Sequence, residues 1–145
     1  MNKEFINRII EKLTHKGTIT SLHQIAKDNN ILIYEANLGS GGGYYFYEKR
    51  CKTIVLNCTL SYYHKLIVLA HEIAHAMLHP YEEAHFTHIG IRINKKENEA
   101  NYFACKLLDV IGFWNNEDLC IYEHEMSKAD KGFIDIYKNY MKGEI

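Results

Sequence analysis

The sequence contains a single proline, and its four cysteines form no C-x-x-C pair. Structural zinc sites are usually closed by four protein ligands, often cysteines at short and regular spacings. A site of that kind is therefore not indicated. The thiols are expected to be reduced groups without a metal role, as is usual in a reducing cytosol. The four residues are Cys51, Cys58, Cys105 and Cys120.

Long apolar runs and an excess of one charge are also absent. No stretch approaches the roughly 20 apolar residues that cross a bilayer, and the first residues lack the apolar run of a signal peptide. The formal net charge of −1 gives no electrostatic reason for direct binding to nucleic acid or to an anionic membrane. We therefore expect a soluble, cytoplasmic protein.

The glycine-rich run at residues 39–43 lacks the Lys-Ser/Thr pair of a phosphate-binding loop, so nucleotide binding is not indicated. The 145 residues are enough to bury a hydrophobic core without disulfides. We expect one domain over residues 1–145.

The residues with the clearest chemistry are His71-Glu72-Ile73-Ala74-His75. On a helix, a spacing of four places the two histidines one above the other, about one turn apart. Two neutral imidazoles in this position can both reach one zinc ion (Zn²⁺) at about 2.0–2.1 Å. Glu72 is rotated by about 100° from His71, so its carboxylate can stand beside the metal and take a proton from an attacking water. This is the H-E-x-x-H arrangement of zinc metalloproteases.

The residues that flank the motif predict that its helix is buried. Apolar side chains precede the motif at residues 66–70 and follow it at residues 76–78. A helix that is apolar almost all round is a buried helix, and an unpaired ionised carboxylate inside one is costly. The alternative is a solvated, histidine-rich helix, which does not account for these flanks. The pattern therefore favours a metal site.

Apolar periodicity, capping residues and turn residues predict the elements around the motif. The helices are expected at residues 4–13, from a cap at Thr20 or Ser21 to Lys27, from a cap at Ser61 to about His79, and from a cap at Asn94 to Asp109. The strands are expected at residues 31–34, 44–47 and 53–56, with the last two joined as a hairpin through residues 48–50.

A third ligand is expected on the last of these helices. Glu97 lies in its first turn and shares one face with Ala100, Asn101 and Ala104 at spacings of three and four. The two alanines would let this helix approach the motif helix closely, so that Glu97 can turn toward the metal. Glu99 lies about 200° round the helix from Glu97, and we expect it to face solvent.

The remaining histidines are not assigned to the metal. His79 lies about 12 Å from His71 along the helix axis at 1.5 Å per residue, which is too far for both to bind one ion. We expect His79 to act as a cationic or hydrogen-bonding residue at the helix C-terminus. His85 and His88 are expected on the surface or in a substrate loop. A donor that stabilises the oxyanion could be Tyr44, His85 or His124, and the sequence favours none of them.

The stretches 69–79 and 97–108 together resemble the ImmA/IrrE-type metallopeptidases. Glu97-x-x-Ala100-Asn101 also matches the E-x-x-[Ala/Ser]-[Asp/Asn] pattern that follows H-E-x-x-H in thermolysin-like zincins. The resemblance implies that Glu97 is the third zinc ligand and that Asn101 supports a zinc-binding histidine. It covers roughly residues 20–110 and departs from the frequent Leu-Leu-Met-Pro of that family at residues 107–110.

This resemblance implies an α+β, zincin-like metallopeptidase domain. A small N-terminal sheet would pack on the motif helix and on the third-ligand helix. Outside the resemblance, the sequence itself predicts helices at 119–126 and 133–141, which would form a C-terminal cap over about residues 113–145. In that family a cytosolic zinc endopeptidase cleaves a helix-turn-helix repressor of a mobile element, phage or stress regulon. The implied site is zinc on His71, His75 and Glu97, with Glu72 as general base, no other cofactor, and a protein partner. The alternative hypothesis is an anti-repressor that binds its partner without cleaving it, and the intact Glu72 favours chemistry.

Overall fold

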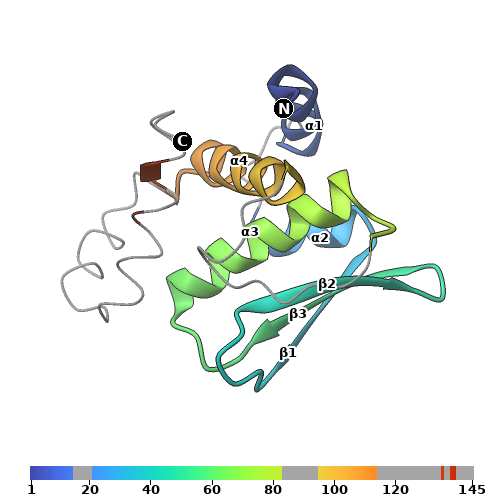
Figure 1. The fold of residues 1–145 in the computed structure, drawn as a ribbon, viewed down its shortest axis with the longest axis vertical. Helices are drawn as coiled ribbons and strands as arrows, with labels where there is room; N and C mark the ends of the chain where they lie inside the picture. Colours follow the sequence, from blue (N-terminus) through green and yellow to red (C-terminus); the bar gives the residue numbers. More distant parts are fainter. Residues whose placement is uncertain (15–20, 83–94, 114–134, 136–137, 140–145) are drawn as a thin grey trace.

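The computed structural model describes residues 1–14, 21–82, 95–113, 135 and 138–139 (Figure 1). Within these residues the elements follow the order α1, α2, β1, β2, β3, α3, α4. The helices are α1 (Lys3–Thr14), α2 (Leu22–Asp28), α3 (Tyr62–Leu78) and α4 (Lys95–Val110). The strands are β1 (Ile31–Ala36), β2 (Gly43–Glu48) and β3 (Cys51–Asn57). Every predicted helix and strand in this part of the chain is confirmed, and each strand is longer than predicted.

Two of the predicted helix caps are formed by serine hydroxyls. Ser21 accepts a hydrogen bond from the backbone N–H of Gln24 at 3.1 Å, and Ser61 accepts one from the backbone N–H of His64 at 3.3 Å. Each bond satisfies an N–H group that has no partner within its helix. These caps fix where α2 and α3 begin.

The sheet is mixed, with the strand order β1-β3-β2. β1 runs parallel to β3, with Ile33 opposite Ile54, and β2 runs antiparallel to β3, with Tyr45 opposite Ile54. The turn of the predicted hairpin consists of Lys49 and Arg50, whose φ angles are 50° and 64°. Positive φ at both central residues gives the turn type whose twist matches that of the strands.

One face of the sheet packs on α3. Residues in register point to the same side of a sheet, so Ile33, Ile54 and Tyr45 share one face. Glu35, on the same side of β1, forms an ion pair with Lys65 of α3 at 2.7 Å. The ion pair identifies this face as the one that meets α3.

Gly43 allows α3 to lie close to the start of β2. A Cβ atom at this position would lie 2.8 Å from the carbonyl oxygen of Val55 and 3.0 Å from Cγ1 of Val68 in α3. A residue without a Cβ is therefore required where backbone and helix approach each other. This approach seats β2 against the turn of α3 that precedes the H-E-x-x-H motif.

Helix α3 lies between the sheet and α4 (Figure 1). Helix α4 packs on α3, α1 packs on α4, and α2 packs on β1 and α3. Buried apolar side chains from all of these elements form one core. The expected α+β fold is thus confirmed, with the motif helix α3 at its centre. The expected packing of the sheet on the third-ligand helix is wrong, because α4 lies on the side of α3 that faces away from the sheet.

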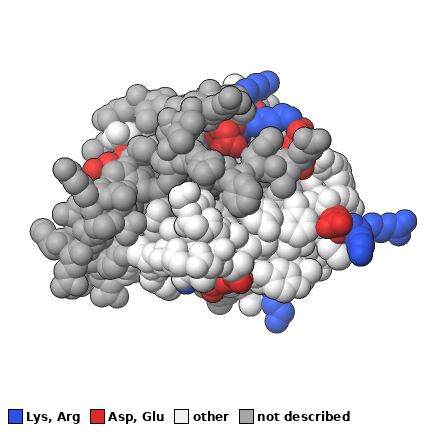
Figure 2. Space-filling view, turned by 60° about the horizontal axis from the view of Figure 1, so that its bottom comes forward, with Lys and Arg blue, Asp and Glu red and all other residues white. Residues whose placement is uncertain are grey.

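The other face of the sheet carries exposed apolar side chains. Leu32 and Tyr34 of β1 are both exposed there. A view toward the sheet side (Figure 2) shows a mostly uncharged surface on the described residues, with charged side chains gathered at its edges. In the part of the chain that the structure describes, no helix is both long and apolar enough to cross a membrane.

Some predictions fall outside the described residues. They are the cap at Asn94, the histidines at 85, 88 and 124, and the helix at 119–126. Of the helix predicted at 133–141, only residues 135, 138 and 139 are described. The C-terminal cap at about 113–145 therefore stays a prediction.

Asn57, the last residue of β3, organises the loop between β1 and β2. Its buried side chain donates from Nδ2 to the carbonyl oxygens of Gly39 and Gly41 at 2.9 and 2.7 Å. Its Oδ1 accepts from the backbone N–H and the hydroxyl of Thr59 at 3.1 and 2.8 Å. Both amide protons and the amide oxygen are thus used, which requires asparagine.

Replacing Asn57 by aspartate tests this network. In Asn57→Asp a carboxylate would face two carbonyl oxygens with no proton to donate, and we expect a loss of about 3 kcal/mol in the free energy of unfolding. The measurement is urea denaturation. The matched control is Asn37→Asp. Among the described residues, the exposed Asn37 side chain accepts one hydrogen bond, from the Gly39 N–H at 3.0 Å, and aspartate can also accept it. Equal losses in the two variants would contradict the assignment.

Candidate metal centre

Helix α3 places two histidines side by side in the interior. Residues 67–74 of this helix are all buried, which confirms the prediction of a buried motif helix. His71 and His75 lie on one face, with their Nε2 atoms 3.1 Å apart. Two imidazole nitrogens that face each other at this distance can serve as ligands of one ion.

Helix α4 brings a carboxylate to the same point. Oε2 of Glu97 lies 3.1 Å from Nε2 of His71, and Oε1 lies 3.1 Å from Nε2 of His75. Ala100 and Ala104 on α4 are fully buried where this helix packs on α3. Their small side chains permit the close approach of the two helices that the sequence predicted.

The three donor atoms fit a divalent metal ion. All lie within 4.8 Å of one another. Two ligand atoms that are each about 2.0–2.1 Å from a tetrahedral ion lie about 3.3–3.4 Å apart. This is close to the 3.1 Å between the two Nε2 atoms and between each Nε2 and one carboxylate oxygen of Glu97. Two imidazoles and one carboxylate are also the donor set of several catalytic metal sites, which keep one position open. Among the described residues, this cluster could therefore hold a metal.

Exposure changes across the cluster. The side chain of His71 is 2% exposed, that of His75 is 17% exposed and that of Glu97 is 24% exposed. The site is thus closed on the His71 side and reaches toward the surface on the Glu97 side. His71 is therefore part of the interior, whereas His75 and Glu97 are partly accessible to solvent.

Glu97 is held in its charged form. Burial by itself raises the pKa of this carboxyl group, but hydrogen bonds and charge interactions with His71 and His75 outweigh it and lower the pKa well below its usual range. An ionised carboxylate at this point can neutralise part of the charge of a bound cation.

Glu72 follows His71 on α3 and is 1% exposed. Its carboxylate is not one of the three groups that converge. Glu72 is therefore buried but is not one of the candidate ligands. The role of Glu72 as general base remains a hypothesis based on the motif.

The prediction that Glu99 faces solvent is wrong. Its side chain is only 21% exposed, and its Oε2 lies 3.8 Å from Nε2 of His79. The reason is that α4 packs on α3, so a residue on another side of α4 still meets the end of α3. His79 itself is the C-cap of α3 and stays outside the converging group, as expected.

Two further residues, Tyr44 and Asn101, are candidates for assisting the site. Tyr44 alternates along β2 with Tyr45, which faces α3, so Tyr44 lies on the opposite face, where it stacks on Phe46 with ring centroids 5.8 Å apart. The structure therefore gives no support to Tyr44 as an oxyanion donor. Asn101 is half-buried on α4, and its support of a ligand histidine stays a prediction.

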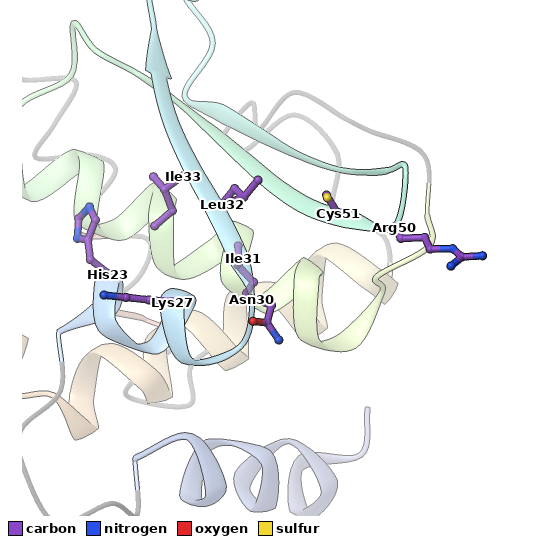
Figure 3. Close-up of a pocket in the computed structure, with 8 residues that line it drawn as sticks. All are labelled: His23, Lys27, Asn30, Ile31, Leu32, Ile33, Arg50 and Cys51. Atoms are coloured by element: carbon purple, nitrogen blue, oxygen red, sulfur yellow. The ribbon is translucent and has the colours of Figure 1, made fainter.

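A pocket of about 540 Å³ lies elsewhere, at the start of β1 beside α2 (Figure 3). Its lining includes basic side chains of Lys27 and Arg50 and apolar side chains of β1. None of the three converging ligands lines it. The candidate metal centre is therefore separate from this cavity.

Comparison with known proteins agrees with this geometry. Residues 26–109 match the model of the peptidase M78 family, described as the IrrE N-terminal-like domain. The chain is also 34% identical over 106 residues to the uncharacterized immunity region protein 2 of Bacillus phage phi105. That alignment covers 71% of this chain and 67% of the phage protein.

Two glutamates of α4 provide a matched test of the ligand set. Glu97 and Glu99 are similarly exposed, but only Glu97 contacts both His71 and His75. After reconstitution with zinc and removal of free ions, Glu97→Ala should lose most of the bound metal, whereas Glu99→Ala should keep about one ion per chain. Elemental analysis measures both. Retention by Glu97→Ala together with loss by Glu99→Ala would refute the assignment.

Proposed function

Since this chain belongs to the ImmA/IrrE family of metallopeptidases, the peptidase M78 family, we propose that it is a cytoplasmic, zinc-dependent endopeptidase. Its substrate would be one specific partner protein, a helix-turn-helix transcriptional repressor. The observation that carries the proposal is the convergence of donor atoms from His71, His75 and Glu97. The H-E-x-x-H motif of the chain also supplies Glu72.

Zinc is the metal we propose for this site. Two neutral imidazoles and one carboxylate form the ligand set of several catalytic zinc enzymes, with a fourth position left for water or substrate. A purely structural zinc site usually has four protein ligands, often cysteines. No cysteine takes part in the cluster found among the described residues. The cluster is therefore not a structural site of that kind. Since Glu97 is the most exposed of the three ligands, we expect substrate to enter on its side.

When bound, zinc would supply Lewis acidity, which polarises a scissile carbonyl group and lowers the pKa of water. The residues of the chain would transfer the proton and hold the ion. Glu72 would accept a proton from the attacking water and later deliver it to the nitrogen of the leaving amine. His71 and His75, fixed on the buried helix α3, and Glu97, fixed on α4, would keep the ion in place during this exchange.

The repressor substrate is suggested by relatives. The phage phi105 relative is named as an uncharacterized immunity region protein, which agrees with a role of this chain in the control of a phage or mobile element. Cleavage of a repressor would release a mobile element, phage or stress regulon from control. Any effect of this chain on DNA would then run through the repressor.

The same fold is also compatible with a second function, that of a protein that binds a repressor without cleaving it. An anti-repressor could grip and block its partner without cleaving it. The retention of Glu72 beside a complete ligand set favours hydrolysis, because a protein that only binds has no need of a base at that position.

The substitution Glu72→Gln separates these two functions. Glutamine keeps the size of the side chain but accepts no proton at neutral pH. Zinc content and folding should stay near those of the wild type, while cleavage should fall by about a hundred- to ten-thousand-fold. The measurement is the appearance of repressor fragments on a gel after co-expression with a candidate helix-turn-helix repressor.

The control is Glu48→Gln, which makes the same chemical change at an exposed position at the end of β2 and should leave cleavage unchanged. If Glu72→Gln relieves repression as well as the wild type does, with no fragments from either, the chain is a binder and not a protease.

A further inference from the structure

His75 has contacts on both of its ring nitrogens. Its Nε2 faces the cluster, 3.1 Å from Nε2 of His71 and 3.1 Å from Oε1 of Glu97. Its Nδ1 lies 3.2 Å from Nδ1 of His79. The imidazole of His75 thus joins the candidate metal centre to a residue outside the ligand set.

The proton positions in this chain of contacts follow from simple chemistry. A neutral imidazole that offers the lone pair of Nε2 to a metal carries its proton on Nδ1. At 3.2 Å, that proton can be donated only if Nδ1 of His79 is the acceptor. The proton of neutral His79 is then on Nε2, which faces Oε2 of Glu99 at 3.8 Å. This last separation exceeds a hydrogen bond, so the carboxylate of Glu99 contributes only a weak charge–dipole attraction to the Nε2–H group.

His79 is held in place by its surroundings. Its side chain is 9% exposed, and its backbone N–H donates to the carbonyl oxygen of His75 at 2.8 Å. The next residue, Pro80, accepts a hydrogen bond on its carbonyl oxygen from the hydroxyl of Tyr45 in β2 at 2.7 Å. The sheet and the last turn of α3 therefore fix the ring that His75 contacts.

We propose that His79 is a positioning residue for the metal centre, whose Nδ1 accepts a hydrogen bond from Nδ1 of His75 and so holds Nε2 of His75 toward the metal. The proposal rests on the zinc site proposed above. Partners of metal-bound histidines fix the tautomer and the orientation of the ring, and their loss typically weakens metal binding by about 10- to 100-fold.

The test compares two replacements of His79. His79→Phe keeps the ring but removes the acceptor, whereas His79→Asn places its amide oxygen near the position of Nδ1 and restores an acceptor. The zinc dissociation constant, measured by competition with a chromophoric chelator, should rise by about 10- to 100-fold in His79→Phe and stay close to the wild-type value in His79→Asn. The control is His23→Phe, at an exposed histidine of α2, which should leave the zinc dissociation constant unchanged.

A second measurement does not depend on a variant that folds. In the zinc-loaded wild type, nitrogen-15 NMR of the imidazoles should show Nδ1 of His75 protonated and Nδ1 of His79 unprotonated. A protonated Nδ1 on His79 overturns the proposal.

The outcomes separate this proposal from the one it rests on. If the wild type binds no zinc, both are overturned. If the wild type binds zinc tightly and a folded His79→Phe binds it equally well, only the role of His79 is overturned. Equal weakening in His79→Phe and His79→Asn also overturns it, because the acceptor would then make no difference.

Discussion

The packing of α4 on α3 brings one carboxylate and two imidazoles from separate helices within 3.1 Å of one another. Each of these groups is costly to bury alone, because ionised or polar side chains lose hydration in the interior. Together they satisfy one another. Ala100 and Ala104 allow the approach because they add little bulk between the helices. The candidate site therefore depends on a helix–helix contact more than on any single residue.

The sheet and the smaller helices stabilise that contact from outside. The sheet holds α3 from one side, with Gly43 permitting a close approach, and α1 covers α4 from the other side. The Tyr45 hydroxyl ties β2 to the chain just beyond α3. Burial raises the pKa of this hydroxyl to about 12, with smaller contributions from Tyr47 and Tyr81, so the group remains a donor at physiological pH. This hydrogen bond ties the sheet to the end of α3, where His79 lies.

The three candidate ligands differ in how deeply their side chains are buried. His71 belongs to the core, whereas His75 and Glu97 reach toward solvent. Membership of the ImmA/IrrE family of metallopeptidases agrees with a cluster that could hold a metal ion. The pocket at the start of β1 plays no part in this site, since its lining comes from α2, the hairpin and β1.

The sequence by itself determined what depends on local periodicity. The spacing of His71 and His75 follows from the helical repeat, the caps follow from serine hydroxyls, and the buried character of α3 follows from its apolar flanks. Glu97 was predicted because its helix face carries small residues. The prediction that Glu99 faces solvent failed because helical angles describe one helix and not its neighbour. They could not show that Glu99 of α4 lies near His79 at the end of α3. The contact of His79 with His75, and the use of Asn57 to hold a distant loop, likewise arise from tertiary packing and side-chain rotamers. These contacts are visible only in the tertiary structure, because each depends on distances between elements, which local sequence patterns do not give.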